Sequence, residues 1–94
     1  MQLDDFLRGR EAYFWGTHQG AELDLLVMVG GKRYGFEIKL TDAPQTTKSM
    51  KIARDDLGLE RLVVVYPGAR SYDLGDSMEV VSILDLPARL ARLR

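Results

Sequence analysis

The stretch GAELDLLVMVGGKRYGFEIK, residues 20–39, holds two apolar runs separated by Gly30-Gly31. Each run alternates between apolar and other residues, which is typical of a β-strand. A Gly-Gly pair favours the two-residue turn of a β-hairpin, because both of its positions require positive φ. We therefore predict strands over residues 22–29 and 32–40, joined by this turn, with the two residues that flank the turn paired to each other.

Four charged side chains inside this hairpin fall on one face of the predicted sheet. In the register set by the turn, Asp24 lies directly opposite Glu37 and Glu22 lies opposite Lys39, and opposed residues share a face. Two opposed carboxylates repel, so folding alone does not explain the pair, whereas a divalent cation is commonly bound by one or two carboxylates. The alternative is a solvated face on which Glu22 and Lys39 form a surface ion pair. The other face is predicted to carry the apolar residues Leu23, Leu25, Val27, Val29, Tyr34, Phe36, Ile38 and Leu40.

The remaining sequence predicts two further strands and two helices after the hairpin. Met50, Ala53 and Leu57 recur at helical spacing, and Gly58 is a natural stop for that helix. Residues 69–77 are rich in turn formers and are predicted to form a loop. The full prediction is a short helix within residues 1–10, strands over 11–16, 22–29 and 32–40, a helix over 45–57, strands over 61–68 and 78–84, and a helix over 85–94.

The final helix is predicted to be amphipathic. Asp85 is a plausible N-cap, because its carboxylate can accept a hydrogen bond from an unpaired backbone N–H of the first turn. The leucines of this segment form the apolar stripe. Its three arginines are predicted on the outer face of the helix: Arg89, Arg92 and Arg94.

This order of elements predicts an α/β fold in a single domain, residues 1–94. The segment from the third strand through the helix to the fourth strand is long enough for a parallel crossover. The run RLVVVY at 61–66 has no alternation, which indicates a strand buried on both faces. We therefore expect a mixed sheet with a crossover helix packed on it, followed by an extra C-terminal strand and helix.

The composition excludes several classes of site. The chain has 94 residues, a net charge of −1 and no cysteine, so disulfides and thiolate metal sites are absent. A near-neutral chain is a poor non-specific DNA binder. No stretch approaches the roughly 20 apolar residues of a membrane span, so we expect a cytoplasmic protein without a membrane partner. The sequence lacks G-x-x-x-x-G-K-[ST], so no nucleotide site is expected in this chain.

Four polar residues outside the hairpin core are further candidates for a site. His18 is the only histidine, and with Gln19 it belongs to the loop THQG. These two side chains either contact a substrate or are simply solvated. Lys48 and Lys51 on the predicted crossover helix either contact a phosphate backbone or form a solvated face.

The pattern Asp24, then Glu37-Ile38-Lys39 on a β-hairpin, resembles the PD-(D/E)xK nuclease superfamily, the restriction-endonuclease-like fold. The run FWGTHQGAELDLLV, followed by GFEIKLTDAP and KSMKIARDDLGLERLVVVYPG, is also similar to the C-terminal domain of unknown function found on many bacterial and archaeal AAA+-type ATPases. These resemblances cover about residues 1–67. They imply an αβββαβ core, and a chain that is the C-terminal part of a longer polypeptide with an upstream ATPase domain.

The nuclease resemblance implies a set of roles for the hairpin residues. Asp24 and Glu37 would bind Mg²⁺ or Mn²⁺, and Lys39 would be the catalytic residue in hydrolysis of DNA or RNA. A further acidic ligand is implied on the first helix, where Asp4 and Asp5 are candidates, as is Glu11 just after it, unless the ligand precedes Met1. The alternative is a non-catalytic module that keeps the fold and binds a partner or regulates the attached ATPase, so enzymatic activity stays open. The accessory residues are Glu22, His18 and Gln19.

Overall fold

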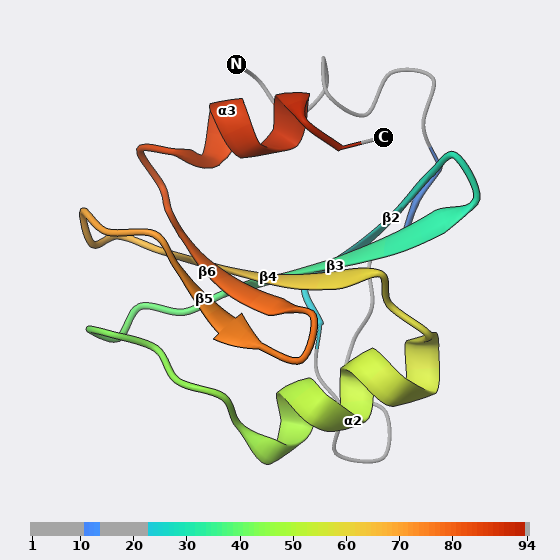
Figure 1. Cartoon of the computed structure of the whole chain (residues 1–94), viewed down its shortest axis with the longest axis horizontal. Coiled ribbons are helices and arrows are strands. Elements are labelled where there is room, and N and C mark those ends of the chain that lie inside the picture. Colours follow the sequence, from blue (N-terminus) through green and yellow to red (C-terminus); the bar gives the residue numbers. More distant parts are fainter. Residues whose placement is uncertain (1–10, 14–22, 94) are drawn as a thin grey trace.

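The computed structural model describes residues 11–13, as backbone, and residues 23–93. The described residues form one mixed sheet with strand order β1-β2-β3-β4-β6-β5. Helix α3 covers one face of the sheet and helix α2 covers the other (Figure 1). The elements are β1 (Glu11–Tyr13), β2 (Leu25–Val29), β3 (Lys32–Ile38), α2 (Lys48–Leu57), β4 (Arg61–Tyr66), β5 (Tyr72–Gly75), β6 (Met78–Ser82) and α3 (Leu86–Ala91).

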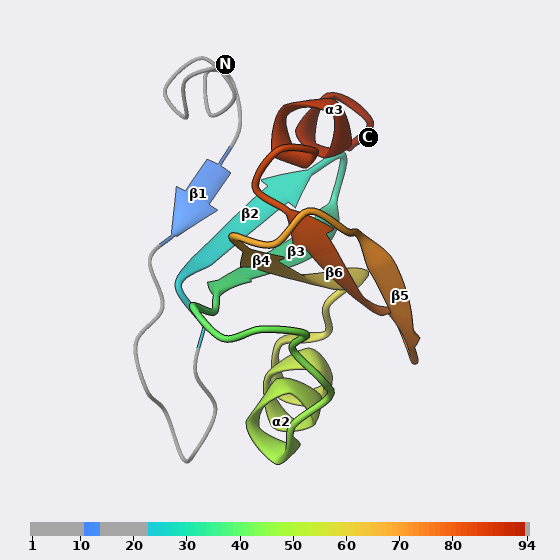
Figure 2. The ribbon, with the colours of Figure 1, turned by 90° about the vertical axis from the view of Figure 1, so that its left-hand side faces the viewer.

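The α/β class and the mixed sheet are confirmed. Strands β2 and β3 are antiparallel, whereas β4 is parallel to both of its neighbours, β3 and β6. The crossover from β3 through α2 to β4 is therefore the predicted parallel connection. Figure 2 shows the strands side by side, with β1 and β5 at opposite ends of the sheet. The helix predicted in residues 1–10 lies outside the described residues.

The hairpin register is also confirmed over the length of β2. Val29 pairs with Lys32, and Leu25 pairs with Phe36. Gly30 and Gly31 both have positive φ, 57° and 79°, as a two-residue hairpin turn of this kind requires.

Strand β4 lies at the centre of the core. Its residues alternate between the two faces, with Leu62, Val64 and Tyr66 in the cluster under α2 and Val63 and Val65 in the cluster under α3. Both faces of β4 are buried, as its unbroken apolar sequence predicts. The sheet is therefore covered on both sides, and a side chain near its centre is removed from water whichever face it occupies.

Helix α2 has well-defined ends that its sequence explains. The Thr47 hydroxyl accepts a hydrogen bond from the Met50 N–H at 3.2 Å, which caps the first turn. Gly58 ends the helix in the left-handed conformation, with φ of 60°. The predicted inward residues are buried, and Lys48 and Lys51 are exposed on the outer face.

Helix α3 differs from its prediction in how it begins. Asp85 is at the N-cap position but makes no capping hydrogen bond, because its carboxylate accepts from the Ser71 hydroxyl at 2.6 Å instead. Leu90 and Leu93 are buried against the sheet as predicted, with Leu86 partly buried beside them.

Two further corrections concern strands. The segment predicted as a loop contains β5, which pairs antiparallel with β6 through a tight turn that holds Asp76 and Ser77 at positive φ. Ile38 and Leu40, predicted on the buried apolar face, are 61% and 84% exposed, because β3 ends at Ile38 and both lie where the chain leaves the sheet. In the described part of the chain no helix has the length and apolarity needed to cross a membrane.

Candidate functional site

The hairpin departs from its predicted register at Asp24. Leu25 pairs with Phe36, yet the N–H of Asp24 also donates to the carbonyl of Phe36, at 3.0 Å. Two successive residues thus oppose a single residue of β3, which is the arrangement of a β-bulge. The bulge moves Leu23 onto the α2 face, where it packs in the cluster with Leu26. The prediction that Asp24 lies directly opposite Glu37 is therefore wrong.

Asp24 nevertheless contacts the segment that carries its predicted partners, Glu37 and Lys39. Its Oδ2 accepts a hydrogen bond from the N–H of Ile38 at 2.7 Å. Ile38 is the residue between Glu37 and Lys39, so the bulge places the Asp24 carboxylate against the centre of the E-x-K segment. The Asp24 residue is exposed, which leaves its carboxylate accessible from solvent.

Glu37 is buried on the α2 side of the sheet, with 5% of its surface exposed. It pairs with Val64, which belongs to the cluster under α2. The Nζ of Lys39 lies 3.4 Å from Glu37 Oε1, and the Lys39 N–H donates to the Val65 carbonyl at 2.9 Å. The alternative of a solvated face is therefore wrong at Glu37, because its carboxylate is held in a largely dry position next to a lysine.

Two carboxylates at this place are of the chemical type that binds a hard divalent cation. Asp24 and Glu37 supply carboxylate oxygens, the ligands that Mg²⁺ prefers, and Mg²⁺ is usually held by one or two of them with water completing its shell. Within residues 23–93, no group of three acidic or histidine side chains forms a metal centre. The accessory candidates Glu22, His18 and Gln19 lie outside the described residues.

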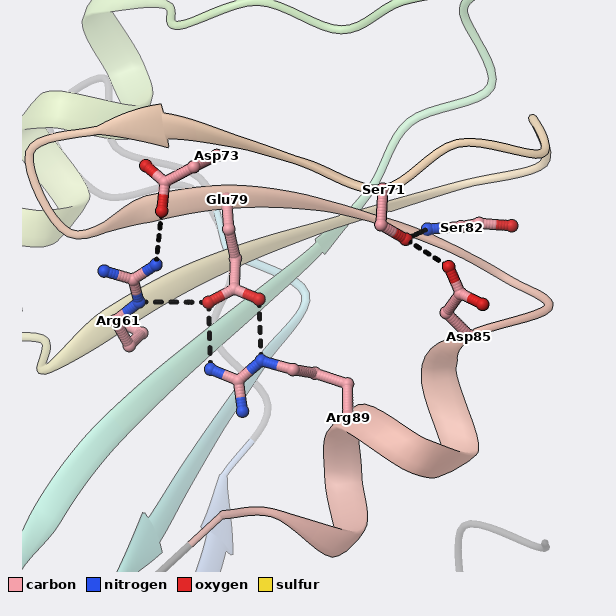
Figure 3. Close-up of polar contacts among 7 residues, drawn as sticks. All are labelled: Arg61, Ser71, Asp73, Glu79, Ser82, Asp85 and Arg89. Atoms are coloured by element: carbon pink, nitrogen blue, oxygen red, sulfur yellow. Dashed lines mark hydrogen bonds and ion pairs between the residues drawn. The ribbon is translucent and has the colours of Figure 1, made fainter.

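A second polar cluster, which the sequence did not predict, lies on the α3 side of the sheet (Figure 3). Asp73 and Glu79 are directly opposed in the β5–β6 ladder. Arg61 donates from Nε to Glu79 Oε1 at 3.0 Å and from Nη2 to Asp73 Oδ2 at 3.1 Å. Arg89 of α3 donates to both oxygens of Glu79, at 2.6 and 2.8 Å. Arg89 is therefore half-buried against the sheet, and its predicted place on the outer face is wrong.

The charges of this cluster shift one another's ionisation. Burial raises the pKa of Glu79, but the hydrogen bonds from Arg89 and Arg61 outweigh burial, so the pKa lies below its ordinary value. The hydrogen bond from the Gly75 N–H and the contact with Arg61 lower the pKa of Asp73. The one signal in the sequence was Glu79 itself, a carboxylate inside the strand MEVVS.

An open hollow of about 300 Å³ adjoins this cluster, between α3 and the β5–β6 hairpin. Most of the polar side chains that line it bind one another, since Arg61 and Arg89 bind Asp73 and Glu79, and the Ser71 hydroxyl donates to Asp85. The cluster therefore fastens α3 to the sheet, and the hairpin site remains the stronger candidate for chemistry.

These features define an α/β domain that carries a buried glutamate paired with a partly exposed lysine, and an adjacent aspartate, at the end of a β-hairpin. The chain belongs to the family described as Domain of unknown function (DUF4143), which matches residues 5–86. An uncharacterized protein of Mycobacterium bovis and one of Mycobacterium tuberculosis are each 46% identical to the chain over 80 residues. The match covers 85% of this chain and spans only 18% of each relative. No solved structure matches the chain at a significant level.

Proposed function

We propose that this domain is a nuclease-like module that hydrolyses phosphodiester bonds of DNA or RNA with Mg²⁺ or Mn²⁺, as part of a longer cytoplasmic protein that contains an ATPase. The observation that carries the proposal is the contact of the Asp24 carboxylate with the Ile38 N–H, at 2.7 Å, between Glu37 and Lys39. The order of three strands, a helix and a parallel strand from β1 to β4 supports the resemblance to the restriction-endonuclease-like fold.

Each residue of the site has a distinct role in this proposal. Asp24 and Glu37 would hold the divalent cation. The cation would polarise a phosphoryl oxygen of the substrate and lower the pKa of a water bound to it. Lys39 places a positive charge next to Glu37 and stabilises negative charge that develops on the phosphate during hydrolysis. The burial of Glu37 keeps that carboxylate away from bulk water, where its electrostatic effect would be screened.

Titration calorimetry with Mn²⁺ and Mg²⁺, followed by cleavage assays on plasmid DNA and on RNA, tests the proposal. We expect one cation to bind the wild-type chain, and Asp24→Ala or Glu37→Gln to abolish that binding. Asp56→Asn removes an exposed carboxylate on α2 and serves as the matched control, which should bind like the wild type. The proposal fails if the wild-type chain binds neither metal, or if cleavage is unchanged by Asp24→Ala.

A second candidate function is a non-catalytic module that docks on the rest of a longer polypeptide and regulates its ATPase. Exposed aliphatic side chains favour it, because apolar groups clustered on one region of a protein surface mark interaction sites. They lie at the carboxyl ends of β3 and β6, which are both parallel to the β4 strand between them and therefore end on the same side of the sheet. The two relatives extend far beyond the matched region. By analogy, the rest of a longer polypeptide would be the partner that binds these side chains. The residues are Ile38, Leu40, Ile83 and Leu84.

Deletion of the domain from the longer protein tests this second candidate, with ATPase turnover and assembly state as the readouts. Leu40→Ser with Leu84→Ser in the intact protein should reproduce the effect of the deletion, because both side chains are exposed and contribute little to the core. An unchanged turnover and an unchanged assembly state after deletion would rule out regulation by this domain.

A further inference from the structure

The segment that follows β3 is held by a hydrogen bond from β5, the strand at one edge of the sheet. Residues 39–47 connect β3 to α2, and Leu40 to Ala43 are exposed along this path. The Tyr72 hydroxyl, from edge strand β5, donates a hydrogen bond to the carbonyl of Pro44 at 2.7 Å. Pro44 is buried, so the contact fixes the segment halfway between the end of β3 and the start of α2.

The ring of Tyr72 is itself held in place. It meets the ring of Tyr66 edge to face, with 6.2 Å between centroids and 83° between planes. The Tyr66 hydroxyl donates elsewhere, to the carbonyl of Arg70 at 2.5 Å. Burial and the neighbouring Tyr66 raise the pKa of Tyr72, so its hydroxyl keeps its proton and remains a donor.

We propose that Tyr72 is a positioning residue for the cation site of Asp24, Glu37 and Lys39, acting through Pro44 on the segment that follows β3. This inference rests on the proposed function. It assigns a role to β5, a strand that lies outside the core shared with the nuclease fold.

The physical basis is the fraying of a strand end. Glu37 is next to the last residue of β3, and Lys39 directly follows the end of that strand. Backbone hydrogen bonds open most easily at the ends of strands. The Lys39 N–H bond to Val65 holds one end of the segment and the Tyr72–Pro44 bond holds its middle. Fixing the middle shortens the free loop and lowers the entropy gained when the end of β3 opens. The cation site is thus kept assembled before the cation arrives.

Two variants that each remove one hydroxyl test the inference. Tyr72→Phe breaks the bond to Pro44, and Tyr66→Phe removes the neighbouring hydroxyl, which bonds to Arg70 and not to this segment. We expect Tyr72→Phe to weaken Mn²⁺ binding about 3- to 10-fold, the size of one lost hydrogen bond, and Tyr66→Phe to leave it unchanged. Equal weakening in both variants, or no weakening in Tyr72→Phe, would overturn the inference.

Amide hydrogen exchange on the metal-free chain gives a second readout that does not need the cation. Amides of residues 38–43 should exchange faster in Tyr72→Phe than in the wild type or Tyr66→Phe. If the wild-type chain binds no Mn²⁺, the proposed function fails, and this exchange experiment still decides whether Tyr72 positions the segment. Unchanged exchange in Tyr72→Phe would refute the positioning role itself.

Discussion

Asp73 and Glu79 lie directly opposite each other on neighbouring strands, and the guanidinium of Arg61 donates a hydrogen bond to each of them. Two opposed carboxylates destabilise a sheet unless a cation lies between them. Asp73 and Glu79 are thus the opposed carboxylate pair of this sheet, and the cation between them is the Arg61 side chain of β4.

Replacing Arg61 with methionine should destabilise the fold. The change removes both hydrogen bonds and leaves two carboxylates facing each other, with only Arg89 bound to Glu79. We expect the free energy of unfolding to fall by about 1–3 kcal/mol, the usual range for hydrogen bonds to charged groups. Urea denaturation measures the loss, and Arg92→Met, on the exposed side of α3, should change the midpoint little. Equal effects of the two variants would contradict this account.

The stabilising effect of Glu79 should decrease as the pH falls. Its pKa in the folded protein lies below the ordinary value of 4.5, so the ionised form is favoured by folding. This contribution is complete above about pH 4.5 and is lost as the pH falls from there through the lowered pKa. Urea titrations of wild type and Glu79→Gln between about pH 7 and pH 3 should show a stability difference that shrinks on acidification. A constant difference would show that charge plays no part.

A larger residue at Gly35 should destabilise the fold while Leu23 and Leu59 are intact. A Cβ at this position would lie 2.7 Å from Leu59 Cδ1 and 2.8 Å from Leu23 Cδ1. Gly35→Ala should therefore lower the free energy of unfolding by about 1–3 kcal/mol, the usual effect of overpacking. In a Leu59→Ala background the same substitution should cost less, because the closest atom is gone, and a double-mutant cycle measures that coupling. Strict additivity would argue against the clash.

The turn between β5 and β6 offers a stabilising substitution. Ser77 has a φ of 64° in the left-handed region, which side chains other than glycine adopt at a cost. Ser77→Gly should raise the free energy of unfolding by about 0.5–1 kcal/mol, after allowing for the extra chain entropy of glycine. Thermal denaturation measures the gain, and a lower melting temperature would contradict it.

The sequence predicted those parts of the fold that local patterns determine. The Gly30-Gly31 turn set the hairpin register, and the apolar spacing around Met50 located α2. The bulge at Asp24 could not be predicted, because it depends on a hydrogen bond from Ile38, fourteen residues away. Strand β5 was missed for a similar reason, since YDLG has turn-forming residues and becomes a strand only by pairing with β6.

The residues of the candidate site stay a prediction, and the structure corrects part of their geometry. Asp24 accepts a hydrogen bond from Ile38, and Lys39 lies beside Glu37, both at the end of β3. The burial of Glu37 was not predicted, because it arises from contacts between elements, which the alternation within one strand does not encode. The same limit explains the error at Arg89. It was predicted on the outer face of the final helix, but it binds Glu79 of β6, a contact that the helix pattern does not encode.

The central position of β4 has a consequence for how the chain folds. Strands β2 and β3, and strands β5 and β6, are close in sequence and form hairpins through local contacts. Strand β4 joins these two hairpins only by parallel pairing on both of its edges, and the pairing with β3 requires closure of the loop that contains α2. Such non-local pairing is slow, so the docking of β4 should set the overall folding rate, and core substitutions in β4 should slow folding more than substitutions at the sheet edges.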